Sequence, residues 1–219
     1  MINKFVSRAV DALADVTDGA VILVSGFGDP GMPFGLVEAL VELGPRNLTI
    51  VSNNAGRALE GVAMLLKRGQ VSKMICAYPR RTGSFVFEER YARGEVELEL
   101  VPQGTLSERI RAAKAGIAGF YTPTAVDTVL AAGKEVREIN GQRCLLEYPL
   151  HADFALIRAH LADRWGNLVY QAAQRNFGPV MAGAARRTIA EVDRMVALGE
   201  LDPEAVVTPG IYVDQVVTL

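Results

Sequence analysis

The sequence predicts an α/β fold in which helices cover a mostly parallel sheet, with added antiparallel strands in the C-terminal part. In the first half, short apolar runs alternate with stretches of helical spacing, which is typical of parallel strands joined by helical crossovers. In the second half, Asn140-Gly141 lies between two strand-like runs and is a strong signal for a tight antiparallel hairpin. The 219 residues contain no internal repeat and no linker-like tract, so a single domain over 1–219 is expected.

Each element follows from its local pattern. Helices are expected over 3–14, 35–43, 59–68, 85–92 and 105–114. Strands are expected over 20–25, 48–52, 73–77, 96–101, 135–139, 142–147, 154–159, 168–170, 188–195 and 211–217, with a second hairpin turning at 165–167. Thr105 and Glu108 have the spacing of a capping box, which predicts that the last helix opens there.

Composition excludes several classes of function. The chain has 23 Lys and Arg against 25 Asp and Glu and no basic block, which argues against a nucleic-acid surface. No apolar run approaches the roughly 18 residues of a membrane span, and the first residues do not resemble a signal peptide, so we expect a cytoplasmic protein without membrane contact. Cys76 and Cys144 lie in apolar segments and are expected to be core thiols. His151 and His160 are nine residues apart, and no metal site is predicted.

The most informative segment is the loop after the first strand. Ser25-Gly26-Phe27-Gly28-Asp29-Pro30-Gly31 follows an apolar run and precedes a helix. Glycines let a backbone approach a ligand closely, and the carboxyl ends of parallel strands are where α/β sheets bind ligands. The loop matches Gly-x-Gly-x-x-Gly, but its prolines fall where a dinucleotide-binding helix would begin, and no acidic residue closes the next strand. A tight turn without a ligand is the alternative.

Several motifs in sequence order resemble family I CoA-transferases, in their first (alpha) subunit. They are Asp18-Gly19 followed by a strand and the glycine loop, then 51–56 (VSNNAG), 101–111 (VPQGTLSERIR), 120–124 (FYTPT), 153–156 (DFAL), 175–177 (RNF) and 208–211 (TPGI). These blocks span nearly the whole chain. One departure is Ser25, which stands where the family signature has a second glycine. A left-handed backbone there would be strained for serine.

The resemblance implies the chemistry and its division between subunits. The family moves CoA between carboxylic acids through a glutamyl-CoA thioester, so coenzyme A enters as a substrate and no permanently bound cofactor is expected. The glutamate lies on the second (beta) subunit, which is the implied partner, and the remaining partners are an acyl-CoA and a carboxylic acid. No glutamate of this chain is therefore assigned as the nucleophile, and four of them are interpreted as solvated or structural: Glu60, Glu88, Glu89 and Glu147.

This chain is expected to supply positioning and charge stabilisation. By resemblance, the acyl pocket is lined by the glycine loop, by Asn53 and Asn54, and by Gln103. Side-chain amides are neutral donors that can stabilise an oxyanion, and Gln103 is expected just before a capped helix N-terminus, where the dipole favours an anion. A polar turn after a strand is the alternative for the two asparagines.

Arg80 and Arg81 are the candidates for substrate selection. Acetoacetate-type relatives tend to have Ser-Tyr-Val-Gly-Glu-Asn here, whereas this chain has 77–84 (AYPRRTGS). A guanidinium matches a second carboxylate, so this region resembles the 3-oxoadipate branch, whose substrates are dicarboxylates. The alternatives are two solvated arginines, and therefore a transferase for acetoacetate or another short-chain acid. More distantly, the chain could be a non-catalytic sensor of an acyl-CoA or sugar phosphate.

Overall fold

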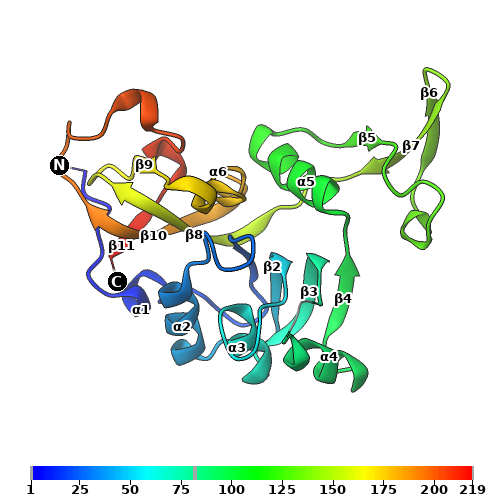
Figure 1. Ribbon diagram of the computed structural model, residues 1–219, viewed down its shortest axis with the longest axis horizontal. Helices are drawn as coiled ribbons and strands as arrows, with labels where there is room; N and C mark the ends of the chain where they lie inside the picture. Colours follow the sequence, from blue (N-terminus) through cyan, green and yellow to red (C-terminus); the bar gives the residue numbers. More distant parts are fainter. Residues whose placement is uncertain (1, 81–82, 219) are drawn as a thin grey trace.

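A parallel sheet runs through the molecule (Figure 1). The computed structural model describes residues 2–80 and 83–218. Within this part of the chain, eight strands form one sheet in the order β11-β10-β8-β1-β2-β3-β4, with β9 paired antiparallel to β8 and all other pairs parallel. The strands are β1 (Val21–Val24), β2 (Leu48–Asn54), β3 (Val71–Tyr78), β4 (Glu97–Leu100), β8 (Ala152–Ala162), β9 (Leu168–Val169), β10 (Ala185–Met195) and β11 (Gln215–Thr218).

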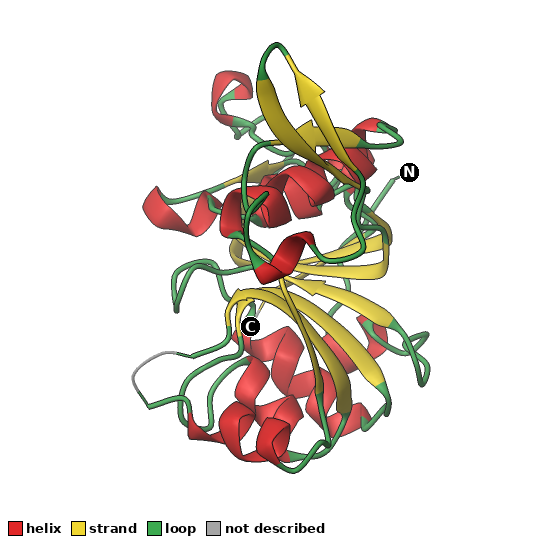
Figure 2. Cartoon of the chain, turned by 90° about the vertical axis from the view of Figure 1, so that its right-hand side faces the viewer, coloured by secondary structure: helices red, strands yellow, loops and turns green. Residues whose placement is uncertain are grey.

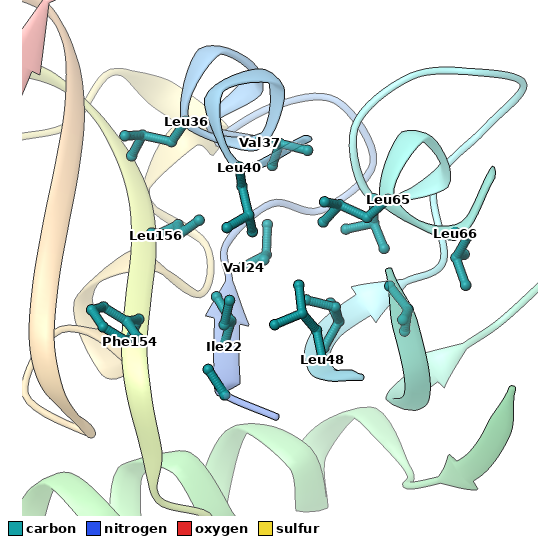
Figure 3. Close-up of a cluster of buried hydrophobic side chains, with 14 of the residues drawn as sticks. Ile22, Val24, Leu36, Val37, Leu40, Leu48, Leu65, Leu66, Phe154 and Leu156 are labelled. Carbon is teal, nitrogen blue, oxygen red and sulfur yellow. The ribbon is translucent and has the colours of Figure 1, made fainter. Parts of the chain in front are cut away.

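Helices cover both faces of this sheet, as Figure 2 shows. One face packs against α1 (Ala9–Ala12), α2 (Phe34–Leu43), α3 (Val62–Lys67) and α4 (Phe85–Ala92), and the other against α5 (Gln103–Ala115) and α6 (Gly178–Met181). Successive strand side chains point to opposite faces, so Ile22 and Val24 join the first core and Leu23 the second. Figure 3 shows Leu40 of α2 directed at the face of β1 that carries Val24 and Ile22.

A second, antiparallel sheet projects from the body as an arm (Figure 1). Its order is β5-β7-β6, formed by Phe120–Thr122, Gln142–Glu147 and Val136–Ile139 respectively. Asn140 and Gly141 form the two-residue turn between β6 and β7, with φ of 52° and 77°. Both values are positive, as a type I′ turn requires, so the predicted hairpin is confirmed.

Three differences from the sequence prediction concern the N-terminal segment, the start of α5 and the C-terminal segment. The N-terminal helix is only Ala9–Ala12, because the preceding segment pairs with β11 through a Phe5–Val216 bridge. Helix α5 begins at Gln103 with Pro102 as its N-cap and without a side-chain capping bond, so the predicted capping box at Thr105 is wrong and Thr105 lies buried inside the helix. The predicted final strand over 211–217 begins later, because Gly210–Tyr212 forms the 3-10 helix η4 and β11 starts at Gln215. The other 3-10 helices of the described residues are η1 (Val129–Ala131), η2 (Ala172–Arg175) and η3 (Pro203–Ala205).

Candidate active site

A pocket of about 620 Å³ lies at the carboxyl ends of β1, β2 and β3. It is lined by Phe27, Gly28, Asp29, Pro30, Asn53, Asn54, Ala77, Tyr78 and Gln103. Three segments singled out in the sequence therefore meet here: the glycine loop, the asparagine pair and Gln103. They meet because parallel strands bring the loops that follow them to one edge of the sheet.

The glycine loop reaches the pocket through its tip, residues 27–30. Gly28 and Gly31 have φ of 69° and 77°, a conformation that favours glycine. A Cβ on Gly31 would lie 2.6 Å from the side-chain nitrogen of Asn176, so the loop also needs glycine there for space. Ser25 has a negative φ and is fully buried beneath the loop, so serine is accommodated at this position without the predicted strain.

The two asparagines are oriented by their own hydrogen bonds. Asn53 is 6% exposed, and its Oδ1 accepts a hydrogen bond of 3.0 Å from Gln103 Nε2. Asn54 is 3% exposed, and its Oδ1 accepts one of 2.9 Å from the Gly56 N–H. Each side-chain oxygen already accepts one hydrogen bond, and the NH₂ group is the part of each amide that can donate to a ligand. Both amides line the pocket, so both NH₂ groups are candidate hydrogen-bond donors to a negatively charged oxygen there.

The pocket wall carries one ionisable carboxylate among the residues that the structure describes, Asp29. Asp29 lies 3.8 Å from Arg57, which also lies 3.7 Å from Glu60. Beneath the pocket, burial raises the pKa of the Cys76 thiol to about 12, partly offset by a backbone hydrogen bond from Tyr78. A thiol with that pKa stays protonated at neutral pH and is not a nucleophile.

The four glutamates interpreted above as solvated or structural do not line the pocket, and neither does His151. Glu60, Glu88 and Glu89 are exposed, whereas Glu147 is buried in the arm and paired with Lys134. His151 immediately precedes β8 and so lies at the amino edge of the sheet, opposite the pocket.

Of the two candidate substrate arginines, the structure describes Arg80. Arg80 follows β3 but does not line the pocket; its side chain is 76% exposed and its Nε lies 3.3 Å from Glu88. Arg81 lies outside the described residues.

Sequence reasoning missed Ala77 and Tyr78 of the pocket wall, and it missed the contact of Asn176 with the glycine loop. Tyr78 lines the pocket from the end of β3 and is 60% exposed. The signal for it was available, because β3 ends beside β2 at the same sheet edge. Asn176 holds the glycine loop from a segment 150 residues away, and no local pattern could reveal that contact.

The described chain has neither a metal centre nor a membrane-spanning helix. Across residues 2–80 and 83–218, no group of three or more His, Cys, Asp or Glu side chains is placed to hold a metal ion. In the same part of the chain, every helix is too short or too polar to cross a membrane.

Comparison with known proteins identifies the family. The model of the coenzyme A transferase family matches residues 6–219. The chain belongs to this family. One subunit of 3-oxoadipate CoA-transferase from Pseudomonas putida is 55% identical over 219 residues, which are 100% of this chain and 95% of the relative. One subunit of succinyl-CoA:3-ketoacid coenzyme A transferase from Xanthomonas campestris pv. campestris is 48% identical, with 98% and 88% covered. The predicted enzyme class, a CoA-transferase subunit, is thereby confirmed.

The fold is also that of solved CoA-transferases. An acyl-CoA transferase from Escherichia coli O157:H7, solved as a thioester complex with CoA, superposes with a TM-score of 0.87 at 23% identity. The match covers 100% of this chain and 50% of that one, so this chain spans half of the longer protein. The predicted fold class is confirmed.

Proposed function

We propose that this chain is the alpha subunit of a two-subunit enzyme that moves CoA from succinyl-CoA to 3-oxoadipate. The supporting observation is the composition of the pocket, which offers amide donors and a glycine loop, while the one carboxylate among its described lining residues, Asp29, is paired with Arg57. Transfer through a covalent thioester needs a carboxylate nucleophile. On this proposal the partner, the beta subunit, supplies it from a glutamate, as the family resemblance implies.

The proposed reaction has two matched halves. The glutamate carboxylate attacks the thioester carbonyl of succinyl-CoA, the C–S bond breaks, and a mixed anhydride and CoA thiolate form. The thiolate attacks the glutamyl carbonyl of the anhydride, which releases succinate and leaves a glutamyl-CoA thioester. A carboxylate of 3-oxoadipate then attacks this thioester, and the same two steps in reverse give 3-oxoadipyl-CoA and the free glutamate.

Each addition places negative charge on a carbonyl oxygen. The NH₂ groups of Asn53 and Asn54 are the proposed donors to this oxyanion, and Gln103 holds Asn53 in the donating orientation. Neutral amides suit the task because they stabilise the oxyanion without lowering the nucleophilicity of the attacking carboxylate through an ion pair. The tip of the glycine loop is proposed to contact the acyl-CoA, since it forms the facing wall of the pocket.

The choice of 3-oxoadipate rests on the name of the 55% identical relative and on the arginines that follow β3. Arg80 lies two residues beyond Tyr78, which lines the pocket, and its exposed side chain is free to exchange Glu88 for a substrate carboxylate. We propose that Arg80 or Arg81 binds the distal carboxylate of the dicarboxylic acid.

The test is a CoA-transfer assay with the chain alone and mixed with its beta subunit, using succinyl-CoA with 3-oxoadipate or acetoacetate. We expect CoA transfer only when both subunits are present, with a preference for 3-oxoadipate over acetoacetate. Transfer by this chain alone would overturn the placement of the nucleophile, and preference for acetoacetate would favour the 3-ketoacid alternative, which the 48% identical relative also supports.

Substituting Arg80 tests the dicarboxylate clamp. Arg80→Ala is expected to lower the kcat/KM ratio of 3-oxoadipate over acetoacetate by about tenfold or more, the effect of losing a hydrogen bond between charged groups. Arg8→Ala is the matched control, because Arg8 is similarly exposed (68%) and lies 3.7 Å from Asp11. An unchanged ratio in Arg80→Ala, and in the same substitution at Arg81, would remove the clamp.

We also propose that the chain forms one domain. In support, both core clusters pack against opposite faces of the same sheet. A cytoplasmic location remains a prediction from the sequence.

A further inference from the structure

The glycine loop is held at both of its ends by two side chains outside its tip. Asn176 Oδ1 accepts a hydrogen bond of 3.1 Å from the Gly26 N–H, and Asn176 Nδ2 donates one of 2.9 Å to the Pro30 carbonyl. Ser25 Oγ donates one of 2.6 Å to the Gly31 carbonyl. One backbone bond within the loop, from the Phe27 N–H to Pro30, complements these three. The loop ends are therefore tied together while residues 27–30 form the pocket wall.

The Asn176 side chain has a single workable orientation. Its Oδ1 also accepts a hydrogen bond of 2.7 Å from the Phe177 N–H, and its Nδ2 also donates one of 2.6 Å to the Ala173 carbonyl. Turning the amide over would set N–H against N–H and C=O against C=O. Because all four groups are matched, the Gly26 and Pro30 contacts are fixed relative to the segment between η2 and α6.

Ser25 anchors the same loop to the sheet. Its hydroxyl is fully buried, and it accepts a hydrogen bond of 3.2 Å from the Arg158 N–H of β8 while donating to Gly31. A glycine at this position, as in the family signature, would leave both backbone groups without this partner. The serine of this chain thus adds a tie between the far end of the loop and β8.

We propose that Ser25 and Asn176 are positioning residues that together fix the glycine loop for CoA transfer. Neither side chain lines the pocket, so neither is placed to touch the substrate. They act through the backbone of residues 26–31. This inference rests on the proposed function, since the loop is taken as the wall against which the acyl-CoA reacts. Displacing a reacting group by about 1 Å can cost about 10²-fold in rate, so the ties should affect kcat more than KM.

The test compares Ser25→Ala, Asn176→Ala and Asn176→Asp in the mixture with the beta subunit. Each is expected to lower kcat by about 10- to 100-fold with KM within about threefold of the wild type. Asn176→Asp keeps the acceptor for Gly26 but sets a carboxylate oxygen against the Pro30 carbonyl. When that carboxyl is protonated it can donate to Pro30 again, so the ratio of variant to wild-type kcat should rise as the pH falls.

Asn167→Ala is the matched structural control. Asn167 also ties two segments with both ends of its amide, donating to Asp163 at 2.8 Å and accepting from the Gly210 N–H at 2.8 Å, and neither of these bonds reaches the glycine loop. It is expected to lower Tm while leaving kcat near the wild-type value. If Asn176→Ala behaves in the same way, or raises KM with kcat unchanged, the positioning role is refuted.

Hydrogen exchange separates this inference from the proposed function. In Asn176→Ala, exchange should speed up in a peptide covering 25–32 and stay unchanged in a peptide covering 48–54. This measurement needs no activity. An inactive wild-type mixture with faster loop exchange in the variant would refute the proposed reaction and support the tie. Unchanged exchange in that loop would refute the tie whatever the activity.

Discussion

The contact between Gln103 and Asn53 gives the sharpest test of the candidate site. Gln103→Glu removes the N–H that donates to Asn53 Oδ1 across 3.0 Å and sets two acceptors against each other. The Asn53 amide is expected to turn and donate its NH₂ to the new carboxylate, so its oxygen then faces the pocket. One oxyanion donor is lost, which costs about 10²–10³ in kcat, or about 2.7–4 kcal/mol of transition-state stabilisation.

The same substitution should not destabilise the fold. Gln103 is the first residue of α5, and a carboxylate in the first turn of a helix is favourable by about 0.3–1 kcal/mol. Initial rates of CoA transfer in the mixture with the beta subunit, together with Tm, separate the two effects. Gln142→Glu, at the exposed first residue of β7 in the arm, is the control and should keep the wild-type rate. A normal kcat in Gln103→Glu would refute the orientation of Asn53 by Gln103.

Three further predictions concern stability and reactivity. Leu40→Ala leaves a cavity where a fully buried α2 side chain meets β1, and should lower the free energy of unfolding by about 2–5 kcal/mol in a urea titration. In a Cys144→Ser background, the Cys76 thiol should not react with a thiol reagent at pH 8 until the protein is unfolded, because burial raises its pKa to about 12; rapid reaction in the native state would contradict this. Burial acts to raise the pKa of Glu99, but hydrogen bonds, chiefly from Arg109, hold this pKa below its usual value. The ionised Glu99 therefore stabilises the fold above its unfolded-state pKa, and this stabilisation is lost as the pH falls through its folded-state pKa. The Tm difference between the wild type and Glu99→Gln should therefore vanish in acid, and a constant difference would contradict the pKa assignment.

Local signals in the sequence predicted the elements well where the backbone itself decides them. The Asn140-Gly141 turn and the extent of α4 are examples, because both depend on residues within a few positions of one another. The capping box at Thr105 failed although its spacing was right. Pro102 is a better place for the helix to begin, since a proline has no N–H to leave unsatisfied, and α5 therefore starts two residues earlier.

The candidate site was predicted in part. Asn53 and Asn54 end β2, and the glycine loop and Gln103 follow β1 and β4, so the rule that parallel strands end at one edge is enough to bring them together. The same rule placed Arg80 at that edge, but the direction of its side chain depends on Glu88 of α4, and the structure turns it toward that carboxylate.

The sequence by itself determined the family, the α/β class, the hairpin turn and three of the segments that line the pocket, because each depends on short motifs that can be recognised one at a time along the chain. Only the tertiary structure decided that β8 lies beside β1, that β10 and β11 continue the parallel sheet, and that Asn176 holds a loop 150 residues away. Strand order and such long-range hydrogen bonds depend on how both faces of the sheet are covered at once. That is a property of the packed whole, and no short window of sequence carries it.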